Sequence, residues 1–412
     1  MAGDFAIGRG AATGGEAAPT RSHKEPIWTW QLVLLLLTVS FGLATLNLAL
    51  PVLPLTVTSV TRNTSSAGIV TAVVALLTMV FELQSARLLA RFRPTLLLLA
   101  GLLVGTIAMV GFALVRTLPA MLVFGGLAGA GFGVVATVST SMVGRLAPPG
   151  RTGEGIGYYG LAASLPAVVA QPASLLLLNR FGISAVFWTG VATSLVALLA
   201  ATQLRAPREG APALPRGGLL ATLSMRPVLL IWASFVCVTF VYGGVISFTP
   251  LLLPGAGLGS APGFLLVAAS ARAVMRMVSG HLIDRLGDWR LVWPSLLLGA
   301  LGLALLPFRQ PALTLLAALL YGVAFGVVQT GALVGMLRST EPSRAAIVGG
   351  LWNMAVDAGL GAGALALAPL AAWLGYQAMF WTLPALFLAA LALRLGAGTG
   401  EEPSGRRVRK AT

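Results

Sequence analysis

The sequence predicts an all-α membrane protein that crosses the bilayer twelve times, and three observations carry this prediction. The 412 residues are 57% hydrophobic with a mean hydropathy of +0.90, far outside the range of water-soluble globular proteins. Only 9% of the residues are charged. The apolar residues gather in runs of roughly 18 or more, enough for a helix to cross a hydrocarbon core of about 30 Å.

The first half of the chain contains six apolar runs. The segment QLVLLLLTVSFGLATLNLAL (31–50) shows no alternation of polar and apolar residues, so it favours a helix over a strand of an outer-membrane barrel. It is too long for the apolar part of a secretory signal and lacks a small-residue cleavage site, so we expect an uncleaved first span. The predicted spans are 30–54, 64–90, 95–115, 118–143, 155–179 and 182–204.

The segment RAPREGAPALPRGG (205–218) interrupts the apolar pattern and divides the chain into two halves. The predicted spans that follow it are 227–253, 258–283, 290–308, 311–337, 344–373 and 376–396. We therefore expect a six-helix half at 28–204, a cytoplasmic linker at 205–226 and a second six-helix half at 227–396. The cytoplasmic tails, 1–27 and 397–412, lack the apolar content to fold alone, and we expect them to be disordered.

The distribution of Lys and Arg predicts the orientation in the membrane. With both termini in the cytoplasm, 21 of the 27 Lys and Arg residues lie inside, 4 lie outside and 2 lie within a span. The positive-inside rule favours this orientation. The net charge of +15 then reflects loops and tails that face anionic lipid headgroups, and we expect no nucleic-acid partner. The single cysteine, Cys237, excludes an intrachain disulfide.

The two halves resemble each other at a nearly constant offset, as internal repeats of secondary transporters do. Three pairs of markers occur in the same order in both halves. The pairs are Pro51 with Pro250, Arg91 with Arg285, and Arg151 with Arg344, at offsets of 199, 194 and 193 residues.

A cluster of polar and charged residues, SGHLIDRLGDWR (279–290), lies between the eighth and ninth spans. Gly280, Asp284, Arg285 and Gly287 form the pattern G-x-x-x-D-R-x-G, which resembles the cytoplasmic loop motif of the major facilitator superfamily. With twelve spans and a 6+6 repeat, the resemblance covers residues 28–396. It implies a pseudo-symmetric bundle that works by alternating access, in which such charged clusters clamp the halves together in the outward-facing state. The alternative is a solvated loop whose charges only fix the topology.

The chain departs from the family pattern in three places. After the second span the acidic position of the loop motif is Ala90, so the clamp is expected to depend on the second half. The fourth span lacks the arginine that drug antiporters of the family commonly carry. The fifth span keeps Pro166 and Pro172 of the antiporter motif but loses most of its glycines.

Four ionisable residues are predicted near the middle of the membrane, where charges are costly and therefore indicate function. They are Glu82, Arg272, Arg276 and Asp357. The family architecture places their helices, the second, eighth and eleventh spans, at the interface between the halves. We expect Glu82 or Asp357 to bind a coupling proton, because burial disfavours the ionised form of a carboxyl group. Arg272 and Arg276, which share a helix face, would attract anionic substrate groups or hold the carboxylates ionised.

Each of these four residues also has a structural alternative. Arg276 precedes the loop motif, where family members often carry an arginine with a structural role. Glu82 is alternatively a packing charge that is satisfied by the eleventh span. Arg272 and Asp357 are alternatively the partners of a static salt bridge within the second half.

Neutral polar residues in the spans are further candidates for contact with a substrate. They are Asn47, Tyr242, Gln329 and Asn353, although polar side chains also hold membrane helices together. Pro51 and Pro250 are expected to bend their helices near the extracellular ends, where gates form in the family.

The sequence contains no Cys/His cluster for a metal and no nucleotide-binding glycine loop, so we expect no enzymatic activity and no cofactor other than the proton gradient as energy source. We expect a monomeric transporter in a bacterial inner membrane that exports a small amphipathic molecule by proton antiport. The alternatives are uptake of a small organic anion, by proton symport or facilitated diffusion, and a sensor or scaffold that transports nothing.

Overall fold

The computed structural model describes residues 27–146, 151–205 and 218–397. This part of the chain is helical and contains no strand, and twelve of its helical stretches are long and apolar enough to cross a membrane. The prediction of a twelve-helix bundle is therefore confirmed. The predicted tails, except residues 27 and 397, and residues 206–217 of the predicted linker lie outside the described residues.

The first half consists of six membrane spans, of which the first is broken at Pro51. Because proline cannot donate a backbone hydrogen bond, α1 ends just before Pro51, and a separate helix, α2, continues the span beyond it. The elements are α1 (Trp30–Ala49), α2 (Leu53–Thr61), η1 (Thr64–Ser66), α3 (Ile69–Arg91), α4 (Pro94–Leu114), α5 (Leu118–Leu146), α6 (Thr152–Phe181) and α7 (Ile183–Thr202).

The second half repeats this arrangement. One short helix, α8 (Gly218–Leu223), lies within the predicted linker, where the hydroxyl of Thr222 accepts a hydrogen bond from Nη1 of Arg344 at 3.0 Å. The other elements are α9 (Arg226–Leu252), α10 (Ala261–Leu286), α11 (Asp288–Leu305), η2 (Leu306–Phe308), α12 (Pro311–Arg338), η3 (Pro342–Arg344), α13 (Ala345–Leu374) and α14 (Tyr376–Gly396).

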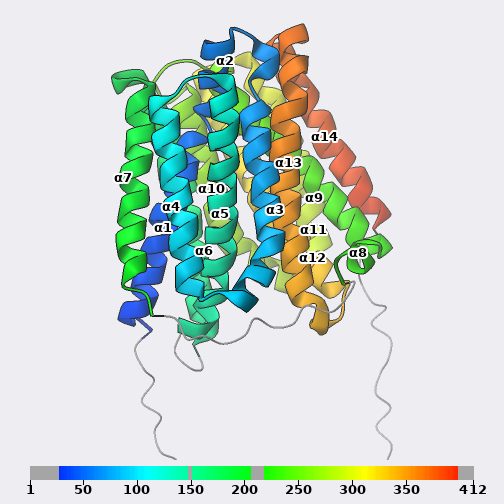
Figure 1. Cartoon of the computed structure of the whole chain (residues 1–412). Helices are drawn as coiled ribbons and strands as arrows, with labels where there is room; N and C mark the ends of the chain where they lie inside the picture. Colours follow the sequence, from blue (N-terminus) through cyan, green and yellow to red (C-terminus); the bar gives the residue numbers. More distant parts are fainter. Residues whose placement is uncertain (1–26, 147–150, 206–217, 398–412) are drawn as a thin grey trace, which may run out of the picture.

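The helix packing confirms that the halves are structural repeats. In the first half α3 packs on α5, α4 on α5 and α7, and α1 on α6 and α7; in the second half α10 packs on α12, α11 on α12 and α14, and α9 on α13 and α14. These are the same pairs of spans in each half. Both ends of the described chain lie at one end of the bundle, which we call the terminal face, and the other end is the opposite face (Figure 1).

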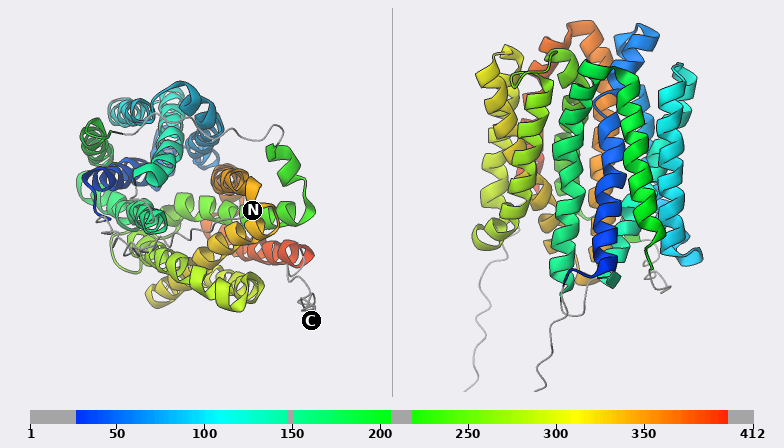
Figure 2. Two further views of the ribbon diagram at one scale, coloured as in Figure 1. Left: turned by 90° about the horizontal axis from the view of Figure 1, so that it is seen from below. Right: turned by 90° about the vertical axis from the view of Figure 1, so that its left-hand side faces the viewer.

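The halves meet along α3, α6, α10 and α13. Helix α3 packs against α13 and α6 packs against α10, while α2 contacts α9 near the opposite face (Figure 2). These helices are the second, fifth, eighth and eleventh spans, as the family architecture implies. The midplane charges of the sequence are therefore carried by the interface helices.

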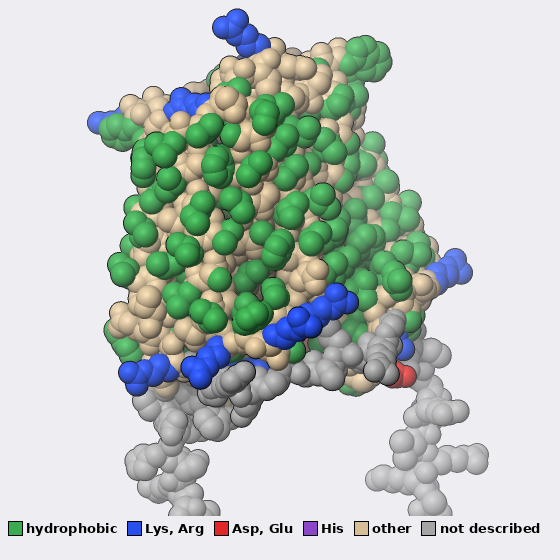
Figure 3. All heavy atoms as spheres, viewed as in Figure 1, with side chains coloured by type: hydrophobic (Ala, Val, Ile, Leu, Met, Phe, Trp, Pro, Cys, Tyr) green, Lys and Arg blue, Asp and Glu red, His purple; other side chains and the backbone are tan. Residues whose placement is uncertain are grey.

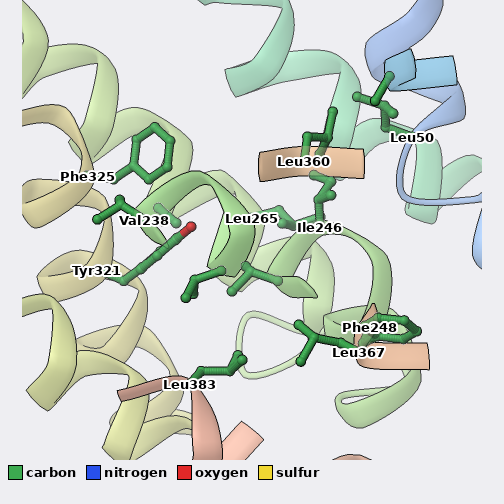
Figure 4. Packing of buried hydrophobic residues seen from close by; sticks show 14 of the residues in the cluster. Leu50, Val238, Ile246, Phe248, Leu265, Tyr321, Phe325, Leu360, Leu367 and Leu383 are labelled. Carbon is green, nitrogen blue, oxygen red and sulfur yellow. The ribbon is translucent and has the colours of Figure 1, made fainter. Parts of the chain in front are cut away.

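The apolar core joins the halves toward the opposite face. Leu50 of the first half belongs to the same buried cluster as Ile246 and Leu360 of the second half (Figure 4). A separate cluster contains only residues of the first half, from Leu34 to Leu204, and reaches the terminal face. The halves thus share one core at the opposite face but not at the terminal face.

Glycines on the interface helices near the terminal face have free space beside them. A Cβ atom placed on Gly157 or Gly160 of α6, or on Gly349 or Gly350 of α13, would meet no heavy atom within 4 Å. By contrast, Gly68 at the start of α3 lies against the backbone of Ala364 in α13. The halves are therefore packed tightly near the opposite face and loosely near the terminal face.

The outer surface matches a lipid environment. Apolar side chains cover the middle of the bundle, and Lys and Arg side chains lie near its two ends, with more of them toward the terminal face in this view (Figure 3). Largely exposed apolar side chains on the spans, such as Trp373 and Leu199, would be unfavourable in water, but hydrocarbon solvates them.

Candidate functional site

A pair of carboxyl groups bridges the two halves in the middle of the bundle. The carboxyl of Glu82 on α3 lies within hydrogen-bonding reach of the carboxyl of Asp357 on α13. Asp357 is buried, and the buried Oε2 atom of Glu82 has no hydrogen-bond donor among the described residues. An ionised carboxylate can only accept hydrogen bonds, so a bond between two carboxyls requires a proton on at least one of them.

The structure brings Glu82 to the eleventh span, but the residue it meets there is another acid. Two ionised carboxylates at this distance would repel each other strongly, as in sites where two acids share one proton. The salt bridge between Arg272 and Asp357 that we considered above is not among the ion pairs of the described residues. Glu82 and Asp357 therefore form a site suited to holding a proton.

The two midplane arginines rest on aromatic rings. The guanidinium carbon of Arg272 on α10 lies 5.1 Å from the ring centre of Tyr242 and 5.3 Å from that of Phe325. Arg276, one turn further along α10, lies 5.5 Å from the ring centre of Trp352. Such contacts stabilise a guanidinium in a poorly hydrated place without neutralising its charge. Neither arginine forms an ion pair with a described acidic residue.

A chain of amide and phenol groups also crosses the interface. The amide nitrogen of Gln171 on α6 donates to Oδ1 of Asn47 at 2.8 Å and to the hydroxyl of Tyr242 on α9 at 3.0 Å. Asn47 and Tyr242 are candidates from the sequence, but Gln171 is not. An isolated amide within an apolar run, directly before Pro172, is the signal that could have identified it.

Several of these residues line one small pocket, which we call the Arg272 pocket. Tyr242 and Arg272 line it together with Gln171, and Tyr321 and Phe325 of α12 complete its aromatic part. The remaining lining is small or apolar: Val245, Leu265, Ala268, Ala269 and Gly322. Gln329 and Asn353 do not line this pocket; the backbone oxygen of Gln329 instead accepts a hydrogen bond from Nε1 of Trp352 at 2.9 Å.

Tyr159 on α6 is a second residue that the sequence reasoning missed. Its hydroxyl hydrogen-bonds with Oγ of Ser139 at 3.0 Å and with Oγ1 of Thr140 at 2.8 Å. It also lies within electrostatic range of both Glu82 and Arg276. Tyr159 thus lies near one acid of the carboxyl pair and near one of the two arginines.

The G-x-x-x-D-R-x-G residues mostly belong to a helix. Gly280, Asp284 and Arg285 lie in the last turns of α10, and only Gly287, with a φ of 84°, forms the turn into α11. Gly280 falls within the expected span 258–283, but Asp284 and Arg285, which we expected in the connection, are helical because α10 continues three residues beyond the expected boundary. Asp284 pairs with Arg338 of the same half at 3.4 Å, and both side chains are exposed. That these charged residues clamp the two halves together stays a prediction, and it concerns the outward-facing conformation.

The four prolines affect their helices differently. Pro51 separates α1 from α2, whereas Pro250 lies within the last turn of α9. Pro166 and Pro172 lie inside α6, the interface helix that carries Gln171. The break at Pro51 is near the opposite face, where the two halves share their core.

Comparison with known proteins gives the family. A family model of the Major Facilitator Superfamily matches residues 32–364. No curated protein matches the chain. Among solved structures, a variant of the nucleoside transporter NupG has a TM-score of 0.74 and 12% identity, covering 89% of this chain and 100% of its own.

Two further structures support the same fold. A bacterial homologue of the human lysosomal transporter Spinster, inward-facing and unoccupied, has a TM-score of 0.73 and 15% identity, covering 91% of this chain and 96% of its own. The human organic anion transporter MFSD10 has a TM-score of 0.64 and 19% identity, covering 89% of this chain and 99% of its own. Similarity at these levels of identity shows a shared fold and nothing about the substrate.

Proposed function

The chain belongs to the major facilitator superfamily and is therefore a secondary transporter, and we propose that it exports a small amphipathic molecule in exchange for protons. The observation that carries this proposal is the contact between the carboxyls of Glu82 and Asp357. Each acid comes from a different half, so the proton that they share also determines how the halves interact.

The carboxyl pair provides a physical link between protonation and conformation. With one proton the two carboxyls attract each other and hold α3 against α13. Without it, two negative charges in a place of low polarity repel each other, and the contact is lost. A ligand that binds one arrangement of the halves shifts the equilibrium, and release of the proton shifts it too.

We assign the terminal face to the cytoplasm of a bacterial cell, with the protein in the inner membrane. The excess of Lys and Arg in the tails and in the connections on that side supports this orientation. The structure is then closed toward the outside, because the halves share a core at the opposite face. In this conformation the shared proton would be released to the cytoplasm.

The direction of transport is proposed as export. The support is the remnant of the antiporter motif around Pro166 and Pro172 in α6, together with the apolar lining of the Arg272 pocket. A proton symporter would use the same carboxyl pair with substrate flux in the opposite direction.

Proteoliposomes with an imposed pH gradient test the proposal. Luminal pH is recorded while amphipathic drugs and organic anions are added to wild type, Glu82→Gln and Asp357→Asn. We expect a substrate to dissipate the gradient with wild type and not with either variant. Glu341→Gln, which neutralises an exposed acid before η3, is the matched control and should behave as wild type.

Two results decide the proposal. The direction of radiolabelled substrate flux under the same gradient separates antiport from symport. If wild type moves substrate equally well without a gradient and both variants match it, the carboxyl pair has no role in coupling and the protein is a facilitator.

A further inference from the structure

We propose that the Arg272 pocket binds an amphipathic organic anion, with the anionic group on Arg272 and the apolar body against α9, α10 and α12. This names the substrate class and rests on the proposed function only for the conclusion that the bound molecule is transported.

The pocket has a positive charge that no described residue neutralises. Arg272 forms no ion pair in the described part of the chain, and no acidic side chain lines the pocket. A charge within a membrane bundle is costly unless a counter-charge or hydrogen bonds stabilise it. The guanidinium carbon of Arg272 lies over the rings of Tyr242 and Phe325, and a ring contact of this kind does not use up the N–H donors with which a guanidinium binds an oxyanion.

The hydroxyl of Tyr242 is set up as a second donor. It accepts a hydrogen bond from Nε2 of Gln171 at 3.0 Å. A phenol that accepts from an amide keeps its own proton for another partner. Gln171 is itself fixed by its second hydrogen bond, to Asn47, and therefore acts as a positioning residue for Tyr242.

The hydroxyl of Tyr321 is the third donor. Tyr321 is only 4% exposed, its hydroxyl has no hydrogen-bond partner in the described part of the chain, and it lines the same pocket. Its side chain extends from α12, as does Phe325 (Figure 4). A buried hydroxyl without a partner is unfavourable, and a ligand oxygen would satisfy it.

The remaining residues of the lining indicate that the uncharged part of the ligand is apolar. Val245, Leu265 and Phe325 provide apolar and aromatic surface, and Ala268 and Ala269 add small apolar side chains from α10. A cationic ligand would face Arg272 without any carboxylate to hold it. An apolar body that carries a carboxylate matches the chemistry of both parts of the lining.

Equilibrium binding to purified protein in nanodiscs tests this inference. The probes are benzoate and 1-naphthoate, with neutral 1-naphthamide as the matched uncharged ligand and empty nanodiscs as the blank. Wild type should bind one of the carboxylates about tenfold or more tightly than the amide binds. Arg272→Gln should remove this preference while leaving 1-naphthamide binding unchanged, and Tyr321→Phe should weaken carboxylate binding several-fold.

Arg290→Gln removes an exposed arginine at the start of α11 and is the charge-matched control, which should bind as wild type. The proposal is overturned if wild type binds neither carboxylate, if it does not discriminate against the amide, or if Arg272→Gln and Arg290→Gln behave alike. Because binding is measured without a pH gradient, loss of coupling in Glu82→Gln and loss of anion binding in Arg272→Gln are separate results.

Discussion

Glu82 and Asp357 show how a single proton can act between two halves of a membrane protein. Acid–base pairs between helices attract in their ordinary charge states, but two acids attract only when a proton is shared. Tyr159 on α6 lies within electrostatic range of Glu82 and also of Arg276 on α10. The phenol and the arginine lie on helices of different halves, so their influence also changes when the halves move.

Glu82→Gln should make the closed opposite face independent of pH. The amide of glutamine can donate to an ionised Asp357, so it imitates the protonated pair at every pH. In wild type, raising the pH removes the shared proton and should increase the separation of α3 and α13. Distances between spin labels on these helices across a pH titration measure this. A pH response of wild-type size in Glu82→Gln would contradict the shared-proton mechanism.

Gln171→Leu should weaken binding of a carboxylate probe by about two- to tenfold, because Tyr242 loses the partner that orients its hydroxyl. Tyr242→Phe should have a similar effect. If the two residues act through one hydrogen bond, the double variant should lose little more than either single variant. Additive losses in this cycle would show that Gln171 and Tyr242 act independently.

At the level of helices, the contact between α3 and α13 depends on small residues. Gly68, at the start of α3, lies so close to the carbonyl of Ala364 that no side chain fits between them. This contact is near the opposite face, about four turns from Glu82 along α3 and about two turns from Asp357 along α13. The two helices are thus held by close packing at one level and by the shared proton at another.

Gly68→Ala should shift the protein toward the conformation that is open at the opposite face. The added methyl group collides with Ala364 only when the halves are closed there. The spin-label distance between α3 and α13 should increase at constant pH, and a thermal unfolding midpoint close to wild type would show that the fold is intact. Gly105→Ala on α4, where an added methyl meets nothing within 4 Å, is the control.

At the level of the whole molecule, the asymmetry between the two faces defines the conformation. The core joins the halves at the opposite face, and interface glycines near the terminal face have free space beside them. With the terminal face in the cytoplasm, this is an inward-facing arrangement. Alternating access requires a second, outward-facing arrangement, and we expect Asp284 and Arg285 to contact the first half in it.

Cysteine labelling tests both the orientation and this conformation. In a Cys237→Ser background, Gly349→Cys should react with an impermeant maleimide in inside-out vesicles and not in right-side-out vesicles. Thr117→Cys, in the exposed connection between α4 and α5, should show the reverse pattern. The same pattern for both positions would reject the proposed topology.

The sequence by itself determined the number of spans, the division into two similar halves and the expected orientation. These properties depend on hydropathy, repeat spacing and charge along the chain, and each is set by residues close together in sequence. Two expected boundaries differ from the structure: the first span continues past Pro51 through α2, and α10 ends at Leu286 and not at residue 283. Hydropathy alone does not show where a proline breaks a helix or where a helix ends in polar residues.

The tertiary structure decided which of the candidate residues meet. The sequence identified Glu82, Asp357 and Arg272 but could not show that the two acids contact each other while Arg272 rests on Tyr242 and Phe325. Gln171 became part of the site only through its hydrogen bond across the interface. Contacts between residues far apart in the chain depend on how whole helices pack, and no local pattern in the sequence specifies that packing.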